Sequence, residues 1–178
     1  KNFFLVLISL IITIIIVELL LIYFYPQPLS GSWRTQNESG LWLNKKNSSA
    51  KHEFINKNNK ISVRYHFGEY HNRIYKNINH QLNRKKILVL GDSYTFGWLL
   101  KDEDTFIFKL QKKYNNFEFI NSSAGGWGAS DYLNYLENYC QKINPNQILI
   151  IINHSDNLRS INSNLYKLQN GKIVNSKN

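Results

Sequence analysis

The feature that most constrains this chain is an unbroken apolar segment near its N-terminus, Phe3 to Tyr25 (FFLVLISLIITIIIVELLLIYFY). A helix of about 20 apolar residues is long enough to cross the hydrocarbon core of a bilayer. Glu18 is the only charged residue in the segment and lies near one end of it. We therefore expect residues 1–26 to form a transmembrane anchor, with residues 3–25 in contact with the lipid bilayer.

Two other interpretations of this segment stay open. A secretory signal peptide has an apolar stretch of only about 7–15 residues, followed by a cleavage site with small residues. The segment here is longer and no such site follows it, so the sequence favours an uncleaved anchor. A helix wholly buried inside a soluble protein is the other alternative.

The residues around the anchor do not settle its orientation. Lys1 is the only charge before the helix, whereas Arg34, Lys45 and Lys46 follow it. This distribution favours a cytoplasmic body, but long domains are translocated largely regardless of such charges. Cys140 is the only cysteine, so no internal disulfide can indicate the compartment. The chain contains no methionine, and we expect it to be a fragment or a trimmed chain.

Positive charge is concentrated directly after the anchor. The net charge is +10, and residues 31–86 hold twelve Lys and Arg against three acids, while residues 87–178 hold nine against eight. The basic segment is rich in Asn and Ser and lacks the aromatic pattern of a protein that binds single-stranded nucleic acid. We interpret residues 27–83 as a mainly solvated basic linker and lead-in, with a weak hairpin signal at 61–82. We expect no nucleic-acid partner.

From residue 84 onward the sequence predicts alternating strands and helices. Residues 87–90 (ILVL), 117–120 (FEFI) and 147–152 (QILIII) are short apolar runs of the kind found in buried strands. Residues 104–114 predict a helix that Asp104 or Thr105 can cap and that ends in two lysines, as the helix dipole favours.

A second helix is expected between the last two strands. Ser130 can cap it, and four of its residues recur at helical spacing and should face the sheet: Leu133, Leu136, Cys140 and Ile143. Residues 164–174 predict at most a small hairpin around Asn170 and Gly171.

This order of elements predicts an α/β domain. Strands linked through helices form a parallel sheet with right-handed crossovers, and continuous apolar strands have to be covered on both faces. We therefore expect a three-layer α/β/α arrangement around a parallel sheet, which looks incomplete at its C-terminal side.

The three predicted strands end in polar or glycine-rich segments. These are GDS at 91–93, NSSAGGWG at 121–128 and NHSDN at 153–157. Ligands of parallel sheets bind beyond the carboxyl ends of the strands, close to helix N-termini. The three segments should therefore meet on one rim, where they form a candidate site.

The residues on this rim suit acyl transfer. A serine that attacks a carbonyl group needs an exposed hydroxyl, donors for the developing oxyanion and a base. Ser93 follows a strand directly and its own backbone N–H can be one donor; the glycine loop and the Asn153 amide can supply others. For each residue a purely structural role is the alternative, namely a capped turn at Ser93, a tight turn at Gly126 and a cap at Asn153.

Three blocks of this sequence, ILVLGDSYTFG, INSSAGGWG and an Asn after the third strand, together resemble the SGNH or GDSL-type serine hydrolases. The resemblance covers about residues 86–160, with Tyr94 in place of the leucine of the family name. It implies a flavodoxin-like fold for residues 84–178, with Ser93 as nucleophile, Gly126 as the second-block glycine and Asn153 as the third-block amide.

The third block leaves an alternative open. An ungapped count from Pro145 puts Ser155 in the asparagine position, whereas a short shift puts Asn153 there, and only asparagine supplies an amide donor. In this family the base belongs to a motif near the end of the domain, in which an Asp is followed by two residues and then a His. No such motif follows residue 157 in this chain. His154 is a weak candidate for the base. We expect no cofactor and no metal site.

The resemblance implies a membrane-anchored, single-pass serine esterase or O-acyltransferase with an extracytoplasmic, periplasmic body. Its substrate would be an acyl ester, with envelope polysaccharide as a candidate carrier of the acyl group. Without a base, we expect weak or no activity from this chain. The rival hypothesis is a non-catalytic, membrane-tethered binding or assembly module that keeps the fold.

Overall fold

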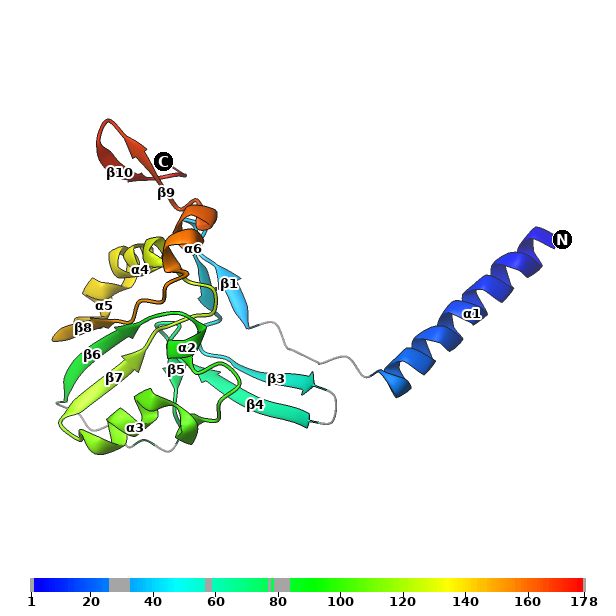
Figure 1. Cartoon of the computed structure of the whole chain (residues 1–178), viewed down its shortest axis with the longest axis horizontal. Coiled ribbons are helices and arrows are strands. Elements are labelled where there is room, and N and C mark those ends of the chain that lie inside the picture. Colours follow the sequence, from blue (N-terminus) through cyan, green and yellow to red (C-terminus); the bar gives the residue numbers. More distant parts are fainter. Residues whose placement is uncertain (1, 26–32, 57–58, 77, 79–83, 178) are drawn as a thin grey trace.

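The computed structural model describes residues 2–25, 33–56, 59–76, 78 and 84–177. It consists of an N-terminal helix and an α/β body (Figure 1). Within the predicted linker, residues 27–32, 57–58, 77 and 79–83 lie outside the described residues.

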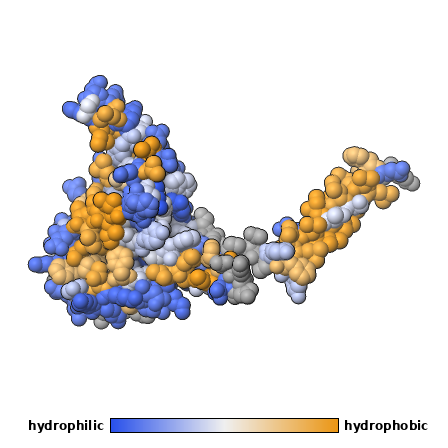
Figure 2. Space-filling model, in the orientation of Figure 1, coloured by the Kyte–Doolittle hydropathy of each residue, from blue (hydrophilic) through white to orange (hydrophobic). Residues whose placement is uncertain are grey.

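Helix α1 spans Asn2–Phe24, almost as the apolar run predicts. Its 23 residues correspond to about 35 Å at 1.5 Å per residue, which exceeds the roughly 30 Å hydrocarbon core of a bilayer. None of its residues is buried, and its apolar surface is open along its length in Figure 2. It is therefore not a core helix here, although a signal sequence meets the same criteria of length and composition as a membrane span.

The body is built on a six-stranded sheet with the order β3-β4-β5-β7-β6-β8. Strands β6 (Lys85–Leu90), β7 (Phe117–Asn121) and β8 (Gln147–Ile150) are the three predicted strands, and they pair in parallel. Strands β3, β4 and β5 extend the sheet in antiparallel fashion. The prediction of a parallel sheet is thus wrong for the whole sheet, which is mixed.

The antiparallel strands come from the segment that we interpreted as a linker. They are β3 (Ser49–Asn56), β4 (Asn59–Phe67) and β5 (Arg73–Ile74). Val63, Tyr65 and Phe67 are buried at alternate positions of β4, with exposed or less buried residues between them. The linker interpretation is wrong here, because these residues alternate with a period of two that buries one face of the sheet. The weak hairpin signal at 61–82 is confirmed in part, since β4 pairs with β5 in antiparallel fashion.

A separate two-stranded sheet precedes these strands. It pairs β1 (Arg34–Gln36) with β2 (Trp42–Asn44) in antiparallel fashion. Leu41 and Leu43 of this hairpin are fully buried in the main core cluster, beside Leu88 and Leu90 of β6. The hairpin therefore belongs to the body.

Helices cover both faces of the sheet at its parallel strand β6. On one face, Ile87 and Val89 of β6 pack with Ile107 and Phe108 of α3 (Phe106–Lys113). On the other, Leu88 and Leu90 lie in the cluster that contains α4 (Ala129–Tyr135), the π-helical turn η2 (Leu136–Cys140) and α5 (Gln141–Ile143). Because alternate residues of β6 point to opposite faces, helices pack on both sides of this strand, and the expected three-layer arrangement is present there.

The first predicted helix is confirmed with its cap. Thr105 precedes α3, and its side-chain oxygen accepts a hydrogen bond from the Phe108 N–H. Lys112 and Lys113 occupy the last turn. A 3-10 turn, η1 (Asp102–Asp104), leads into the helix.

The second predicted helix differs in its start and in its buried face. Ser130 is not its cap: Gly128 precedes α4, and the Gly128 N–H donates to the Asp131 carboxylate at 2.9 Å. Tyr132 and Tyr135 are buried, whereas Leu133 is 38% exposed. Of the other residues expected to face the sheet, Ile143 is buried in the core cluster and Leu136 packs against it. The predicted spacing is thus confirmed at these two positions and wrong at Leu133, which lies before the π-helical turn η2 that changes the helical phase.

The C-terminal part forms the predicted hairpin but leaves an edge uncovered. Strands β9 (Tyr166–Gln169) and β10 (Lys172–Asn175) pair around Asn170 and Gly171, whose positive φ values of 53° and 73° suit a two-residue hairpin turn. The apolar residues of β8 are 39–45% exposed. Their expected coverage on both faces is absent among the described residues.

Candidate functional site

Ser93 lies at a tight turn between β6 and the short helix α2 (Ser93–Phe96). Asp92 caps this helix, because its carboxylate accepts a hydrogen bond from the Tyr94 N–H at 2.9 Å. Gly91 has no room for a side chain, since a Cβ there would lie 2.2 Å from the Thr95 hydroxyl oxygen. The GDS segment therefore folds α2 closely over the end of β6 and leaves Ser93 half-buried on the rim.

Ser93 and Gly126 border the same cavity, which has a volume of about 280 Å³. Its other lining residues are Trp33, Arg34, Phe96, Trp98 and Gly125. The Ser93 Cβ is 3.9 Å from the position of a Cβ on Gly125, so the nucleophile candidate and the glycine loop are in close contact. No described residue makes a hydrogen bond to the Ser93 hydroxyl.

The glycine loop presents open backbone to this cavity. Gly126 has a φ of 80°, and no atom lies within 4 Å of the position its Cβ would take. Within the described part of the chain, the N–H groups of Ser93, Gly125 and Gly126 donate no backbone hydrogen bond. These three donors border the cavity and are available to an acceptor that binds there.

Arg34 is a cavity residue that sequence reasoning missed. Its Nη2 donates to the Gly125 carbonyl at 3.2 Å, and its guanidinium lies 5.4 Å from the centre of the Trp42 ring. Burial lowers the pKa of Arg34, while the nearby Asp131 carboxylate acts in the opposite direction. No local pattern in the linker-like composition around Arg34 pointed to a site.

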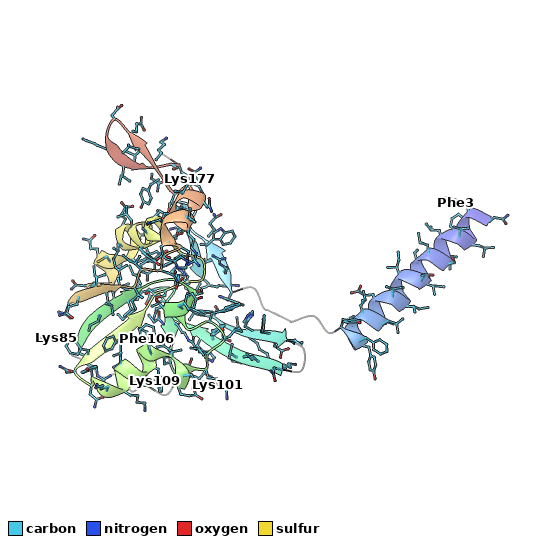
Figure 3. All side chains as sticks on the ribbon, viewed as in Figure 1. Phe3, Lys85, Lys101, Phe106, Lys109 and Lys177 are labelled. Atoms are coloured by element: carbon cyan, nitrogen blue, oxygen red, sulfur yellow. The ribbon has the colours of Figure 1, made fainter. Side chains whose placement is uncertain are left out.

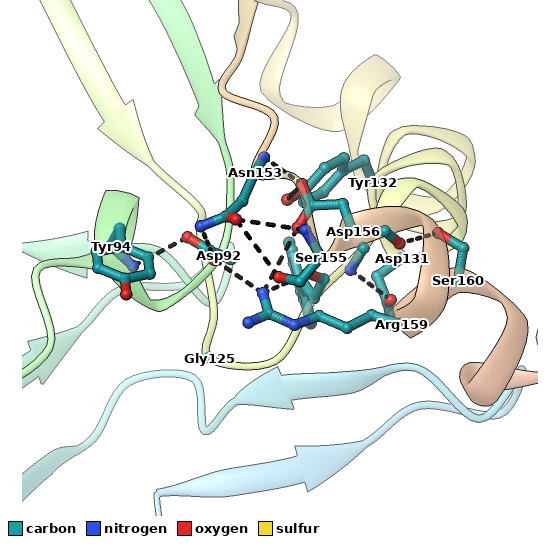
Figure 4. A network of polar contacts seen from close by, with 12 residues as sticks. Asp92, Tyr94, Gly125, Asp131, Tyr132, Asn153, Ser155, Asp156, Arg159 and Ser160 are labelled. Atoms are coloured by element: carbon teal, nitrogen blue, oxygen red, sulfur yellow. Dashed lines mark hydrogen bonds and ion pairs between the residues drawn. The ribbon is translucent and has the colours of Figure 1, made fainter.

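Asn153 is not among the residues that border the cavity. Its Nδ2 donates to Asp92 at 3.3 Å, and its backbone N–H donates to Asp156 at 2.8 Å (Figure 4). The Ser155 hydroxyl, the open alternative, donates to the side-chain Oδ1 of Asn153 at 3.4 Å. The structure thus brings Ser93 and Gly126 together, whereas Asn153 supports the cap of the Ser93 helix.

Arg159 of α6 (Asp156–Ser163) ties the three strand ends to one another. Its Nη1 donates to the buried Asp92 carboxylate at 2.7 Å and to the Trp127 carbonyl at 3.3 Å. The hydrogen bond that Arg159 donates to Asp92 is the main cause of the raised pKa of Arg159. Asp156 accepts from the Tyr132 hydroxyl at 2.8 Å. Nothing in the sequence pattern indicated the role of Arg159.

The described residues place no base at the Ser93 hydroxyl. No His, Asp or Glu is among the residues that border the cavity. His154 is exposed and makes no polar contact with other described residues. His52 lies behind Trp98, whose indole N–H donates to His52 Nε2 at 3.1 Å, so that nitrogen already accepts a hydrogen bond. The described residues also contain no cluster of three or more His, Cys, Asp or Glu side chains that could hold a metal ion.

We expect alanine substitutions at Gly126 and Gly128 to lower the free energy of unfolding by different amounts. A Cβ on Gly128 would lie 2.3 Å from the backbone oxygen of Asp156, so Gly128→Ala should push α6 away from α4 and lower the free energy of unfolding by about 2–3 kcal/mol. Gly126→Ala meets no atom and should cost only the strain of its positive φ, about 1 kcal/mol. Urea unfolding of the full chain in mild detergent measures both values. Equal losses would contradict the packing described here.

Comparison with protein-family models, with curated protein sequences and with solved structures gives no match to this chain.

Proposed function

We propose that this protein is a membrane-anchored, SGNH-like serine esterase or O-acyltransferase that acts through an ester on Ser93. The observation that carries the proposal is the shared cavity: an unbonded serine hydroxyl borders the same space as the unpaired backbone N–H groups of Gly125 and Gly126. Both lie at the carboxyl ends of parallel strands, where α/β proteins bind their ligands.

The reaction that suits these groups is a two-step acyl transfer. The Ser93 oxygen attacks the acyl carbonyl carbon and its proton passes to a base, which leaves a tetrahedral oxyanion that N–H donors stabilise. The intermediate then releases the alcohol, which takes up the proton, and the acyl group stays on Ser93. Water or a second hydroxyl attacks this ester, frees the serine and completes hydrolysis or transfer. In this scheme Ser93 is the nucleophile and the backbone N–H groups are the donors. The base is a further group that the described residues do not place at the cavity.

The walls of the cavity favour a small acyl group. Trp33, Phe96 and Trp98 surround Ser93 with aromatic carbon. A volume of about 280 Å³ lies just below the roughly 300–1,000 Å³ of sites for drug-sized ligands. The acyl part of an ester can enter this space, while a bulky alcohol part, such as a polysaccharide, stays at the surface.

The apolar helix α1 supports a place at the membrane. A single span would hold the body close to the bilayer, and the proposal puts the body on the extracytoplasmic side, where O-acyl groups of envelope polysaccharides would be within reach. Protease protection in intact and opened membrane vesicles tests this orientation. Digestion of the body only after the extracytoplasmic face is exposed is the expected result.

A second candidate function is a non-catalytic, membrane-tethered binding module. Two observations favour it: no described base contacts Ser93, and the Asn153 amide donates to Asp92, which does not border the cavity. Under this alternative the aromatic cavity binds an ester or a sugar without turning it over.

Fluorophosphonate labelling of the full chain, with and without added imidazole, separates the two functions. Imidazole can act as the base that the described residues do not place at Ser93, so we expect label to accumulate at least about tenfold faster in its presence, within the usual contribution of general-base catalysis. Ser93→Ala should abolish this labelling, and Ser155→Ala, which changes a serine on the same rim, should not. Labelling that is unaffected by Ser93→Ala would leave the binding module as the function.

A further inference from the structure

A larger hollow lies outside the Ser93 cavity and has a volume of about 660 Å³. One wall is the β1–β2 hairpin with the turn that follows it, and the other is formed by η2 and α5. None of the residues that border the Ser93 cavity takes part in it. It is thus a second candidate binding site with its own chemistry.

The hollow is strongly cationic. Lys45 and Lys46 follow β2, and Lys142 lies on α5 across from them, whereas Glu38 is the only acid in the lining. None of the three ammonium groups forms an ion pair with a described residue. Three cations that face one space without a carboxylate partner repel one another, and an anion bound between them would relieve this repulsion.

The floor of the hollow is rigid and neutral. His71 is 8% exposed, its Nδ1 lies 2.5 Å from the Asn44 carbonyl oxygen, and its Nε2 lies 3.3 Å from the Tyr139 hydroxyl. Burial lowers the pKa of His71; the hydrogen bond with Asn44 opposes this shift and the charge of Lys46 adds to it. The histidine is therefore neutral at pH 7, with Nδ1 as donor and Nε2 as acceptor. Tyr139 in turn stacks on Tyr135 at 4.7 Å, so the shape of the floor is fixed by packing.

The rest of the lining suits hydroxyl groups. It contains five neutral hydroxyl or amide side chains, Thr35, Gln36, Asn37, Ser39 and Asn138. The donor groups of Gln36, Asn37, Ser39 and Asn138 already make hydrogen bonds within the protein. The Thr35 hydroxyl and the side-chain oxygens of Gln36 and Asn138 are left to bond a ligand, and these oxygens can accept from sugar hydroxyl groups.

We propose that this hollow binds a ligand that carries a carboxylate or phosphate group beside several hydroxyl groups, which is the chemistry of an acidic sugar. The three lysines hold the anionic group, and the neutral side chains contact the hydroxyl groups. The site is independent of the proposed reaction at Ser93, because it shares no residue with that cavity.

Calorimetric titration of the full chain in detergent at low salt tests this site. The probes are a short oligogalacturonate, glucose 6-phosphate, a neutral malto-oligosaccharide and inorganic phosphate. We expect at least one of the two acidic sugars to bind about tenfold or more tightly than both the neutral sugar and phosphate alone. Which one binds identifies carboxylate or phosphate as the anionic group.

Two triple variants locate the binding. Replacement of Lys45, Lys46 and Lys142 by glutamine should weaken binding at least about tenfold, which corresponds to about 1.4 kcal/mol. The same replacement of the exposed Lys85, Lys101 and Lys109, which Figure 3 labels and which border none of the described hollows, should change it less than about twofold, even though the loss of net charge is equal. Equal weakening by both variants, equal affinity for the neutral sugar, or no binding of either acidic sugar would overturn the proposal.

Discussion

Arg73→Met is expected to lower the free energy of unfolding by about 3–5 kcal/mol, the usual cost of removing one partner from a buried, hydrogen-bonded ion pair. Arg73 is 2% exposed. Its Nη1 donates to the carbonyls of Phe96 and Gly97 at 2.9 and 2.8 Å. Its Nη2 donates to the Leu100 carbonyl at 2.9 Å and to the Asp102 carboxylate at 2.8 Å.

These contacts make Arg73 the support of the chain that follows the candidate nucleophile. Its guanidinium also lies over the rings of Tyr65, Tyr75 and Phe96, at 4.8, 5.5 and 5.3 Å from their centres. Methionine can fill part of this space, but it removes the donor to the Phe96 and Leu100 carbonyls and to the Asp102 carboxylate, while the Gly97 carbonyl keeps the hydrogen bond from the Leu100 N–H. The loss should therefore exceed what a change in packing alone would cause.

Urea unfolding followed by tryptophan fluorescence measures this effect, and two variants control it. Arg73→Lys keeps the charge but not the planar fork of donors, so we expect it to be nearly as unstable as the methionine variant. Arg64→Met, at an exposed position on β4, should change the free energy by less than about 0.5 kcal/mol. A loss below about 1 kcal/mol for Arg73→Met would mean that the contacts of Arg73 do not hold this loop.

Asp92→Ala is expected to cost about 3 kcal/mol and to abolish fluorophosphonate labelling of Ser93. The loss of the cap on α2 contributes about 1 kcal/mol. The remaining loss of stability comes from the ion pair between the buried Asp92 carboxylate and Arg159, whose atoms are 2.7 Å apart. We expect less than the full cost of breaking a buried ion pair, because the Arg159 side chain is 29% exposed.

Asp92→Asn separates the two contributions. Asparagine keeps an oxygen that can accept from the Tyr94 N–H, but it removes the charge that faces Arg159. We therefore expect a stability between those of the natural protein and the alanine variant, with labelling of Ser93 partly retained. Asp104→Ala, at an exposed position, is the control and should change neither stability nor labelling. Full labelling of Asp92→Ala would show that α2 needs no cap to present Ser93.

The parallel half of the sheet could be predicted because its signals are local. Strand β6 is a short apolar run that ends in GDS, and the cap of α3 by Thr105 follows from residue type and position. The shared cavity of Ser93 and Gly126 follows from the rule that the carboxyl ends of parallel strands lie on one edge. Each of these features depends on a few neighbouring residues.

The missed features depend on contacts between distant parts of the chain. Arg73 and Arg159 are two among many basic residues until the fold brings the Phe96 carbonyl to one and the Asp92 carboxylate to the other. The direction of the Asn153 side chain, toward Asp92, is set by the packing of α6 and not by a pattern along β8. The alternation of β4 gave only a weak hairpin signal, because the Lys- and Asn-rich composition of the segment around it favoured a linker.

The most direct test of acyl transfer through Ser93 is the mass of the protein after brief incubation with p-nitrophenyl acetate and imidazole. The proposal predicts the added mass of one acetyl group, mapped by peptide analysis to the segment that contains Ser93 and absent from Ser93→Ala. An acetyl group on other residues only, or equal acetylation of the natural protein and the Ser93→Ala variant, would contradict it.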